Sequence, residues 1–135
     1  MIKPIYAIVI ITTVFLSCNS NEKKTPMSEI NVANAFIRDI LDNHLTDAEQ
    51  YLLKDTTNGQ YFDSFKKQYA KKDKAELEKY KASDINVNEI SYVTDTICIF
   101  NYSNNYNIKV KNKLKIVRVG GKWLVDFKYT FSGNL

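Results

Sequence analysis

The residue types that most often bind metals or act as nucleophiles are scarce in this sequence. It contains two cysteines, Cys18 and Cys98, and one histidine, His44. These residues lie far apart in the chain, and none has the spacing of a zinc, haem or iron–sulfur site. We therefore expect no metal and no cofactor. No Cys-His arrangement is evident, so we predict no catalytic residue: Cys98 is interpreted as a small buried hydrophobe, and His44 as a helix-end residue that either caps the helix or faces water.

Cys18 differs from Cys98 because a signal-like segment precedes it. Residues 1–3 form a short basic start, and residues 5–16 (IYAIVIITTVFL) are almost entirely apolar and carry no charge. As a helix, residues 5–16 would span about 18 Å, whereas the hydrocarbon core of a bilayer is about 30 Å thick. The segment is therefore short for a membrane-spanning anchor and is typical of the apolar region of a signal peptide.

The apolar segment ends in Phe15-Leu16-Ser17-Cys18, which resembles the lipobox of bacterial lipoproteins. The match comprises an apolar stretch, a small residue and the obligatory cysteine; Phe15 departs from the usual leucine. The resemblance implies that residues 1–17 are a signal peptide that is removed, and that the Cys18 thiol receives a diacylglycerol. The partner of Cys18 would then be the lipid bilayer of a bacterial cell envelope. The alternative is an ordinary secretory signal in which Cys18 is incidental.

Residues 18–27 are predicted to comprise the lipidated cysteine and a flexible tether, because residues 19–27 are polar and lack hydrophobic periodicity. Some envelope lipoproteins carry an acidic cluster after the cysteine that resembles a signal for export to the cell surface. Here Glu22 is the only acidic residue of the tether. This favours a position facing the periplasm over one on the cell surface.

Residues 28–135 are long and apolar enough for one packed domain, since the whole chain has 135 residues, of which 44% are hydrophobic and 25% charged. Helical periodicity begins at Ser28, which is a suitable N-cap, and ends near residues 43–44. The capping-box pattern of residues 46–49 predicts a short second helix that stops at residues 55–59. A third helical stretch follows, and the sequence leaves open whether a break at Asp73 divides it.

From Asp84 onward the apolar residues alternate with polar ones, as they do in half-buried strands. We predict four strands, with a bulge in the first, a long third strand over residues 108–116, and a last strand over residues 123–129. Gly120 and Gly121 are predicted to form a two-residue hairpin turn. The fold class is therefore α+β, with about three N-terminal helices packed on one face of a curved four-stranded antiparallel sheet.

This order of elements, ending in residues 118–127 (RVGGKWLVDF), resembles the nuclear transport factor 2 superfamily. More narrowly, it is similar to small bacterial lipoproteins of that fold whose last hairpin carries a Gly-Lys-Trp core. The resemblance covers residues 28–131. It implies a cone in which the sheet curls around the first helix and leaves a concave pocket. The superfamily includes ketosteroid isomerase as well as many binding domains, so the fold does not choose a function.

In such a cone, the pocket would be lined by inward-facing residues of the first helix and the last two strands. These are Phe36, Ile40, Val110, Asn112, Trp123, Val125 and Phe127. Asn112 interrupts the apolar side of its strand, and a buried amide needs hydrogen-bond partners. It would bind a polar group of a ligand, lie at a bulge, or reach solvent where the strand bends. The sequence also leaves open whether side chains fill the pocket completely.

Four lysines alternate with the apolar residues of the predicted third strand, namely Lys109, Lys111, Lys113 and Lys115. Together they would form a positive ridge that contacts an anionic membrane, a polysaccharide or an acidic partner. The alternative is a solvated face that prevents aggregation. The whole chain has 19 basic and 15 acidic residues, a net charge of +4, and this mild excess on an exported protein does not suggest nucleic acid as a partner.

The sequence therefore predicts a lipid-anchored envelope protein whose domain binds a small ligand or a protein partner without catalysis. One alternative is an enzyme of the ketosteroid isomerase type that uses the cone cavity, although no acid, base or oxyanion donor can be assigned to it. Another is a purely structural lipoprotein with a filled core. The outer face of the sheet would support a homodimer, as in relatives of this shape.

Overall fold

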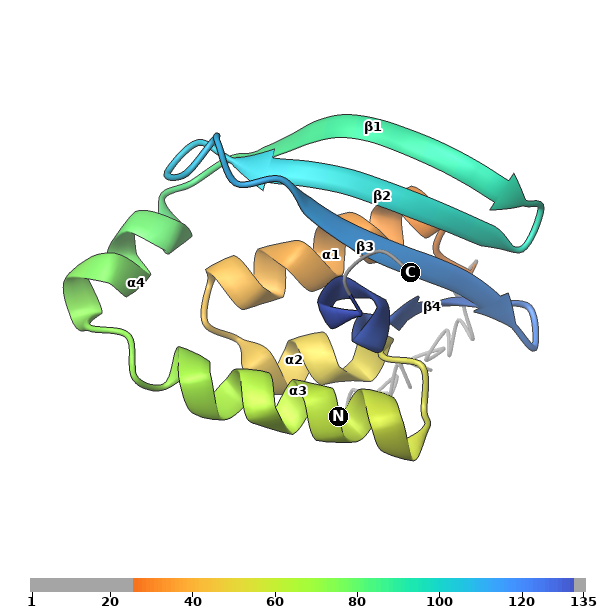
Figure 1. Ribbon diagram of the computed structural model, residues 1–135, viewed down its shortest axis with the longest axis horizontal. Coiled ribbons are helices and arrows are strands. Elements are labelled where there is room, and N and C mark those ends of the chain that lie inside the picture. The colour runs from red at the N-terminus through yellow and green to blue at the C-terminus, as the bar shows by residue number, and fades with distance from the viewer. Residues whose placement is uncertain (1–25, 133–135) are drawn as a thin grey trace, which may run out of the picture.

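The computed structural model describes residues 26–132, so the predicted signal peptide, Cys18 and most of the tether lie outside the described part of the chain. The order of elements is helices first and then an antiparallel sheet, which confirms the predicted α+β class (Figure 1). The helical elements are α1 (Glu29–Leu41), α2 (Leu45–Ala48), the 3-10 turn η1 (Glu49–Tyr51), α3 (Thr56–Tyr69), α4 (Lys74–Lys81) and the 3-10 helix η2 (Phe127–Phe131). The strands are β1 (Ile85–Thr94), β2 (Ile97–Asn104), β3 (Asn112–Val119) and β4 (Lys122–Asp126).

Both ends of α1 follow the predicted capping pattern. The Ser28 side chain accepts a hydrogen bond from the backbone N–H of Asn31, at 3.3 Å, and so caps the first turn. At the other end, Asn43 adopts a left-handed backbone with φ of 61°, which ends the helix. The His44 side chain is exposed and forms no capping hydrogen bond to α2, as expected of a helix-end residue that faces water.

The predicted boundaries around residues 46–59 are wrong. α2 begins at Leu45, so residue 46 is inside the helix and does not cap it. Leu52 lies outside the helix and forms an isolated parallel bridge with Val125 at the edge of the sheet. α3 begins at Thr56, where the sequence predicted a loop, because the Asp55 side chain accepts a hydrogen bond from the backbone N–H of Asn58 at 2.7 Å.

The third helical stretch is two helices, which settles the alternative left open by the sequence. α4 starts afresh after Asp73, whose carboxylate accepts a hydrogen bond from the backbone N–H of Glu76 at 2.7 Å. Arg38 then ties α1 to the end of α4, since its guanidinium donates to the backbone carbonyls of Ser83, at 2.7 Å, and Lys81, at 3.0 Å. The partly buried guanidinium of Arg38 therefore holds α1 and the end of α4 together.

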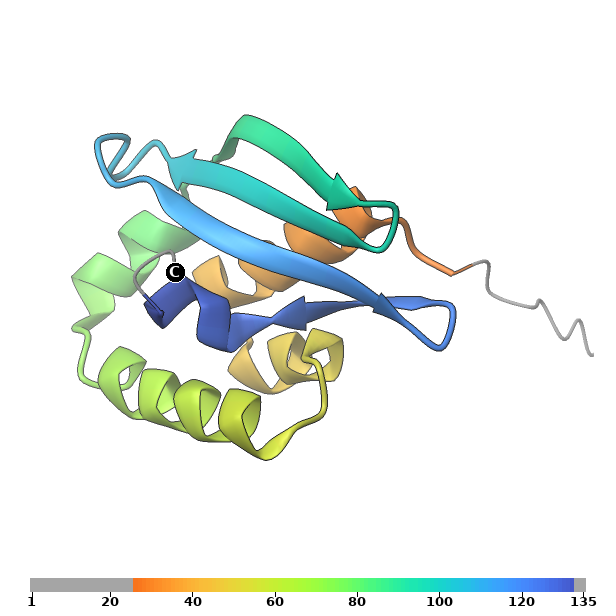
Figure 2. The same cartoon turned by 45° about the vertical axis from the view of Figure 1, so that its right-hand side comes forward.

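The sheet is an open meander in the order β1-β2-β3-β4, with every pair antiparallel. β1 contains two register shifts, so the predicted bulge is confirmed. Gly120 and Gly121 form the β3–β4 turn with φ of +57° and +77°, as predicted for a turn that needs glycine. α1 lies against one face of this sheet and contacts all four strands; α2 packs beside α1, and α3 packs against η2, which continues from β4 (Figures 1 and 2).

Two predicted strand segments are wrong. Residues 108–111, predicted as the first part of the third strand, belong instead to a loop over residues 105–111, because turn-type hydrogen bonds join Asn107 to Asn104 and Val110 to Asn107. The last strand ends at Asp126, and Phe127 begins η2 instead. That turn carries the Phe127 ring into the helical layer, where it packs edge-on against Phe62 with ring centres 5.2 Å apart.

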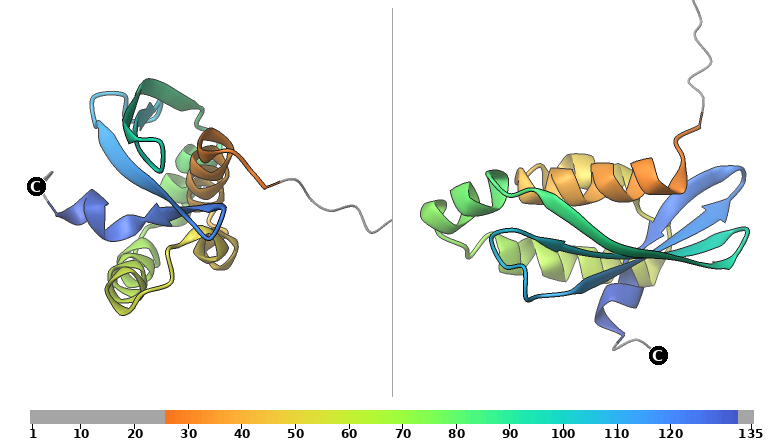
Figure 3. Two further views of the ribbon diagram at one scale, coloured as in Figure 1. Left: turned by 90° about the vertical axis from the view of Figure 1, so that its right-hand side faces the viewer. Right: turned by 90° about the horizontal axis from the view of Figure 1, so that it is seen from above.

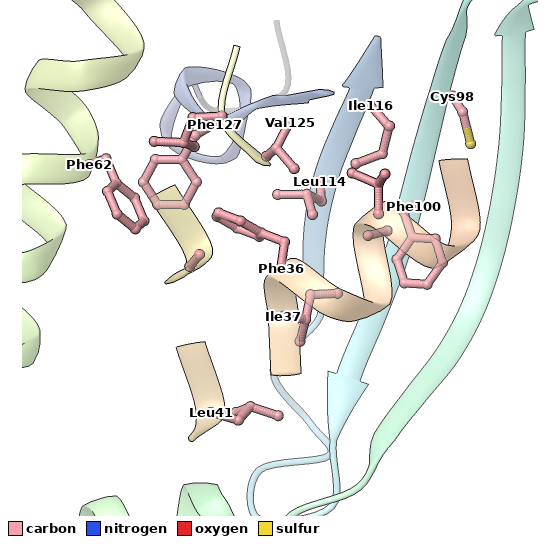
Figure 4. Packing of buried hydrophobic residues seen from close by; sticks show 14 residues of the cluster. Phe36, Ile37, Leu41, Phe62, Cys98, Phe100, Leu114, Ile116, Val125 and Phe127 are labelled. Carbon is pink, nitrogen blue, oxygen red and sulfur yellow. The ribbon is translucent and has the colours of Figure 1, made fainter. Parts of the chain in front are cut away.

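The core lies between α1 and the sheet and continues to α3 (Figure 4). Phe36 of α1 is at its centre, is completely buried, and contacts the rings of Phe62 and Phe127. Cys98 is also buried on the inner face of β2, as predicted, and burial raises the pKa of its thiol. Across residues 26–132, none of the helices combines the length and apolar character that crossing a membrane requires.

Candidate functional site

One cavity of about 240 Å³ opens between the helical layer and the end of the sheet beside α4. Its walls come from the second half of α1, from α3 and α4, from β2, β3 and the loop that joins them, and from η2. The apolar part of the lining consists of Ile37, Ile40, Leu41, Phe65, Val110, Phe127 and Phe131. A concave, mainly apolar space of this kind is typical of small-molecule sites, and its volume is near the lower end of their range.

Two uncharged polar groups lie side by side on the sheet wall of this cavity. Tyr102 of β2 and Asn112 of β3 are directly paired across the two strands, so their side chains share one face. Burial raises the pKa of Tyr102, so its phenol stays protonated and can donate. Neither the Tyr102 hydroxyl nor the Asn112 amide takes part in a hydrogen bond within residues 26–132, which leaves both available to a bound molecule.

Two other polar groups of the cavity wall, the Tyr69 hydroxyl and the Lys72 ammonium, are already engaged. The Tyr69 hydroxyl donates to the backbone carbonyl of Ile40 at 2.8 Å, and burial raises the pKa of Tyr69 to about 12. The Lys72 ammonium forms an ion pair with Glu76 and lies over the ring of Tyr80, 5.0 Å from its centre. These contacts fix the α3 side of the cavity wall and leave the Tyr102–Asn112 pair as the uncharged polar groups of the sheet wall that are available to a bound molecule.

Among the described residues, the lining includes no aspartate, glutamate, histidine or cysteine. The described walls therefore offer no carboxylate, imidazole or thiol as a base or nucleophile, and their titratable groups are the Lys72 ammonium and the phenols of Tyr69, Tyr80 and Tyr102. Likewise, no group of three or more metal-ligating side chains occurs within residues 26–132. The arrangement can enclose a small apolar molecule and bind its polar group through neutral hydrogen bonds.

The structure separates the seven residues that the sequence placed in one pocket. Ile40, Val110, Asn112 and Phe127 line the cavity, although Val110 reaches it from a loop rather than a strand. Phe36 and Val125 are completely buried in the core. Trp123 lies at the opposite end of the sheet, in a groove beside Met27. Sequence reasoning missed Tyr102 as part of a pair with Asn112, because the strand register that joins them is a long-range feature.

The four lysines do not form one strand ridge. Lys109 and Lys111 are exposed in the β2–β3 loop, and the ammonium of Lys111 donates to the side-chain oxygen of Asn88 at 3.2 Å. Lys113 and Lys115 lie on the outer face of β3, but Lys115 is paired with Asp126 at 3.3 Å. A contact of these lysines with an anionic surface stays a prediction.

A polar cluster centred on the buried side chains of Asn58 and Asp126 joins α3 to the end of β4, and it was not predicted from the sequence. The Asn58 amide donates to Asp55, at 2.8 Å, and to Asp126, at 3.1 Å, and its oxygen accepts from the backbone N–H of Lys128 at 2.8 Å. The Lys128 ammonium lies 2.9 Å from Asp126 and 3.1 Å from Asp55. The sequence Asp55-Thr-Thr-Asn58 is typical both of a helix N-cap and of a turn. The sequence therefore predicts a turn where the structure has the start of α3.

This cluster makes the stability of the domain depend on pH. Burial alone would raise the pKa of Asp126, but hydrogen bonds from Lys128, Asn58 and Lys115 outweigh it and hold the pKa below its ordinary value of 3.8. A lowered carboxyl pKa stabilises the fold above the unfolded-state value, and this stabilisation is lost as the pH falls through the folded-state value. We expect urea unfolding to show an Asp126-dependent loss of stability below about pH 4.

The variant Asp126→Asn should lose about 2 kcal/mol of unfolding free energy at pH 7, because it removes a charge that three donors share. It should also show a weaker dependence on pH between 3 and 7 than the unchanged protein. The matched control is Asp95→Asn, in the exposed β1–β2 turn, which should unfold like the unchanged protein at pH 7. Equal stability of both variants would contradict the role given to the cluster.

Comparison of the chain with family models, curated proteins and solved structures finds no match.

Proposed function

We propose that this chain is a lipid-anchored protein of a bacterial cell envelope whose domain binds a small, mainly apolar and uncharged molecule without catalysing its conversion. The anchor in this proposal is Cys18, at the end of the signal-like segment. Lipidation on a short tether keeps such a domain at the membrane surface while leaving its cavity open to the surrounding compartment. A position facing the periplasm is favoured, because the tether has a single acidic residue, Glu22, in place of the acidic cluster that resembles a surface-export signal.

The observation that carries the binding proposal is the cavity with the Tyr102–Asn112 pair on its wall. An apolar enclosure supplies affinity by removing apolar surface from water. The neighbouring phenol and amide would select a molecule with a carbonyl, hydroxyl or amide group, because an unsatisfied polar group in the cavity costs free energy. The absence of carboxylate and imidazole from the described lining favours binding over catalysis of the ketosteroid isomerase type.

The relation to the nuclear transport factor 2 superfamily is also part of this proposal. It is supported by the order of helices followed by a four-stranded antiparallel meander, and by the position of α1 against the inner face of the sheet. Cavities between helices and a curved sheet serve many unrelated ligands, so the superfamily relation by itself does not identify the molecule that binds here.

Phenol is a suitable probe, because it combines an aromatic ring with one hydroxyl group. We expect phenol, titrated into the protein, to shift the backbone amide resonances of residues around Tyr102 and Asn112. Toluene, which has a similar ring and no hydroxyl, should bind more weakly to the unchanged protein. The preference for phenol should disappear in Asn112→Leu, whose side chain cannot form the hydrogen bond.

The variant Val110→Trp tests the position of the site. The larger ring should occupy the cavity from the loop and weaken phenol binding at least tenfold. Its control is Ile108→Trp, two residues away on the same loop, where the side chain is 56% exposed and is not part of the lining. Unchanged binding by Val110→Trp, or equal losses in both variants, would contradict the proposed site.

A further inference from the structure

The described chain begins at the end of the domain that carries the β3–β4 turn. Pro26 and Met27 line a groove together with Tyr51 of η1 and Trp123 and Leu124 of β4. Figure 3 shows the chain entering α1 beside the β1–β2 and β3–β4 turns, whereas the β2–β3 loop is at the opposite end. The end that receives the tether is therefore built from α1's first turn, η1 and the β3–β4 hairpin.

A tether between Cys18 and this end of the domain would be short. The eight residue steps from Cys18 to Pro26 span at most about 28 Å when fully extended, and about 16 Å as a flexible coil. α1 alone carries the chain about 20 Å further toward the opposite end of the domain. A lipid on Cys18 would therefore hold the hairpin end close to the bilayer and the β2–β3 loop away from it.

The side chains at this end have the composition of a membrane-interface contact. Met27 is 41% exposed, and Trp123 and Tyr51 are partly exposed beside it in the groove; Val119, paired with Lys122 next to the turn, is 52% exposed. Tryptophan and tyrosine are the residues enriched at the headgroup level of bilayers, because one end of each ring system is apolar and the other polar.

Two basic residues, Arg118 and Lys122, lie next to Trp123 on this surface. Arg118 lies over the Trp123 ring, 5.9 Å from its centre, and Lys122 lies in the groove. Neither Arg118 nor Lys122 forms an ion pair within residues 26–132. Two acidic residues are present at this end of the domain: Glu29, which accepts a hydrogen bond from the Tyr92 hydroxyl at 2.7 Å, and Asp95 in the β1–β2 turn. The free cations beside Trp123 suit phospholipid phosphates.

We propose that the surface formed by Met27, Tyr51, Arg118, Val119, Lys122 and Trp123, here called the hairpin face, rests on the phospholipid surface of the membrane that carries the anchor. The inference rests on the proposed lipidation of Cys18. In this orientation the rings of Trp123 and Tyr51 reach the headgroup layer, and Arg118 and Lys122 contact lipid phosphates. The ligand cavity, beside α4 at the opposite end, faces the aqueous compartment.

Trp123 reports this contact directly, because it is the only tryptophan in the chain. The experiment uses the full lipoprotein, as produced by the cell, in vesicles of phosphatidylethanolamine and phosphatidylglycerol with or without brominated acyl chains. We expect Trp123 emission to shift to shorter wavelength on reconstitution and to fall at least twofold with brominated lipid. A matched control, Trp123→Phe combined with Tyr106→Trp, moves the fluorophore to the β2–β3 loop and should show no quenching.

Charge reversal tests the same face by a second route. Arg118→Glu with Lys122→Glu should reduce quenching of Trp123 by more than half, whereas Lys109→Glu with Lys111→Glu, at the far end, should leave it unchanged.

Flotation of the vesicles distinguishes a failure of the proposed anchor at Cys18 from a failure of the proposed hairpin face. Protein that floats with unquenched Trp123, or equal quenching of both fluorophore positions, overturns the hairpin face while the anchor stands. Protein that does not float overturns the anchor, and the hairpin face with it.

Discussion

Phe36→Ala is expected to lower the free energy of unfolding by about 3–5 kcal/mol, as large-to-small changes at fully buried aromatic sites do. The ring of Phe36 has no exposed surface, and its centre is 6.0 Å from that of Phe62 and 5.7 Å from that of Phe127. Through these contacts Phe36 of α1 links the part of the core beneath the sheet to the part that packs on α3. Small domains have about 5–15 kcal/mol of stability in total, so the variant should be close to unfolding at ambient temperature.

Urea unfolding followed by far-ultraviolet circular dichroism measures this loss. Phe131→Ala is the matched control, because the change is identical but the Phe131 side chain is 48% exposed. Its ring stacks on Tyr61, so a loss of about 1 kcal/mol is expected. If Phe36→Ala unfolds at the same urea concentration as Phe131→Ala, the core does not have Phe36 at its centre.

Cys18→Ala is expected to abolish lipid attachment completely and to move the protein out of the membrane fraction. The thiol of Cys18 is the group that would be acylated, and alanine offers no nucleophile in its place. Two or more acyl chains bind a membrane far more firmly than one, so their loss should be visible as a change of fraction rather than a small shift. Metabolic labelling with an alkyne fatty acid, followed by membrane fractionation, measures both effects.

Cys98→Ala is the control for the labelling experiment. Cys98 is buried in β2, and burial, with a smaller contribution from the charge of Glu29, raises the pKa of its thiol. A protonated, inaccessible thiol is a poor acyl acceptor, so this variant should keep the full label. Label retained by Cys18→Ala and lost from Cys98→Ala would reverse the assignment and remove the basis for an anchor at residue 18.

The fold class, the sheet order and several element ends could be predicted because local chemistry determines them. Ser28 is a helix cap in the prediction and in the structure, Gly120-Gly121 is a turn in both, and Asp73 lies at the break that the sequence left open. These features depend on hydrogen bonds within three or four residues or on the backbone freedom of glycine. Tertiary contacts reinforce them but are not needed to specify them.

The segments that were predicted wrongly have patterns that fit two structures. Residues 108–116 alternate apolar and basic side chains like a strand, yet the turns at Asn104 and Asn107 fold the first part into a loop. In that loop, Tyr106 packs edge-on against Tyr80 of α4, with ring centres 5.0 Å apart. Strand pairing and this packing compete for the same residues, and only the tertiary structure decides between them.

The cavity could be predicted from the sequence only in part, because some of its lining residues are brought together only by the tertiary structure. The alternation of β3 places Asn112 among inward-facing residues, which correctly marked it as unusual. Its partner Tyr102 is known only from the register of β2 against β3, and Phe127 reaches the cavity only because the chain leaves β4 after Asp126. The alternation of side chains along β4 predicts which face of the sheet Trp123 lies on, but not at which end of the sheet. Trp123 was therefore predicted in the same pocket, although it lies at the opposite end.

The proposal that a lipid-modified cysteine holds this domain at a membrane is tested most directly by the intact mass of the protein extracted from cell membranes. The account predicts a chain that begins at Cys18, with residues 1–17 absent and the mass of a diacylglyceryl group, with or without a further acyl chain, added to that residue. A protein recovered from the aqueous fraction that begins at Met1, or one cleaved near residue 18 without added lipid, would contradict it.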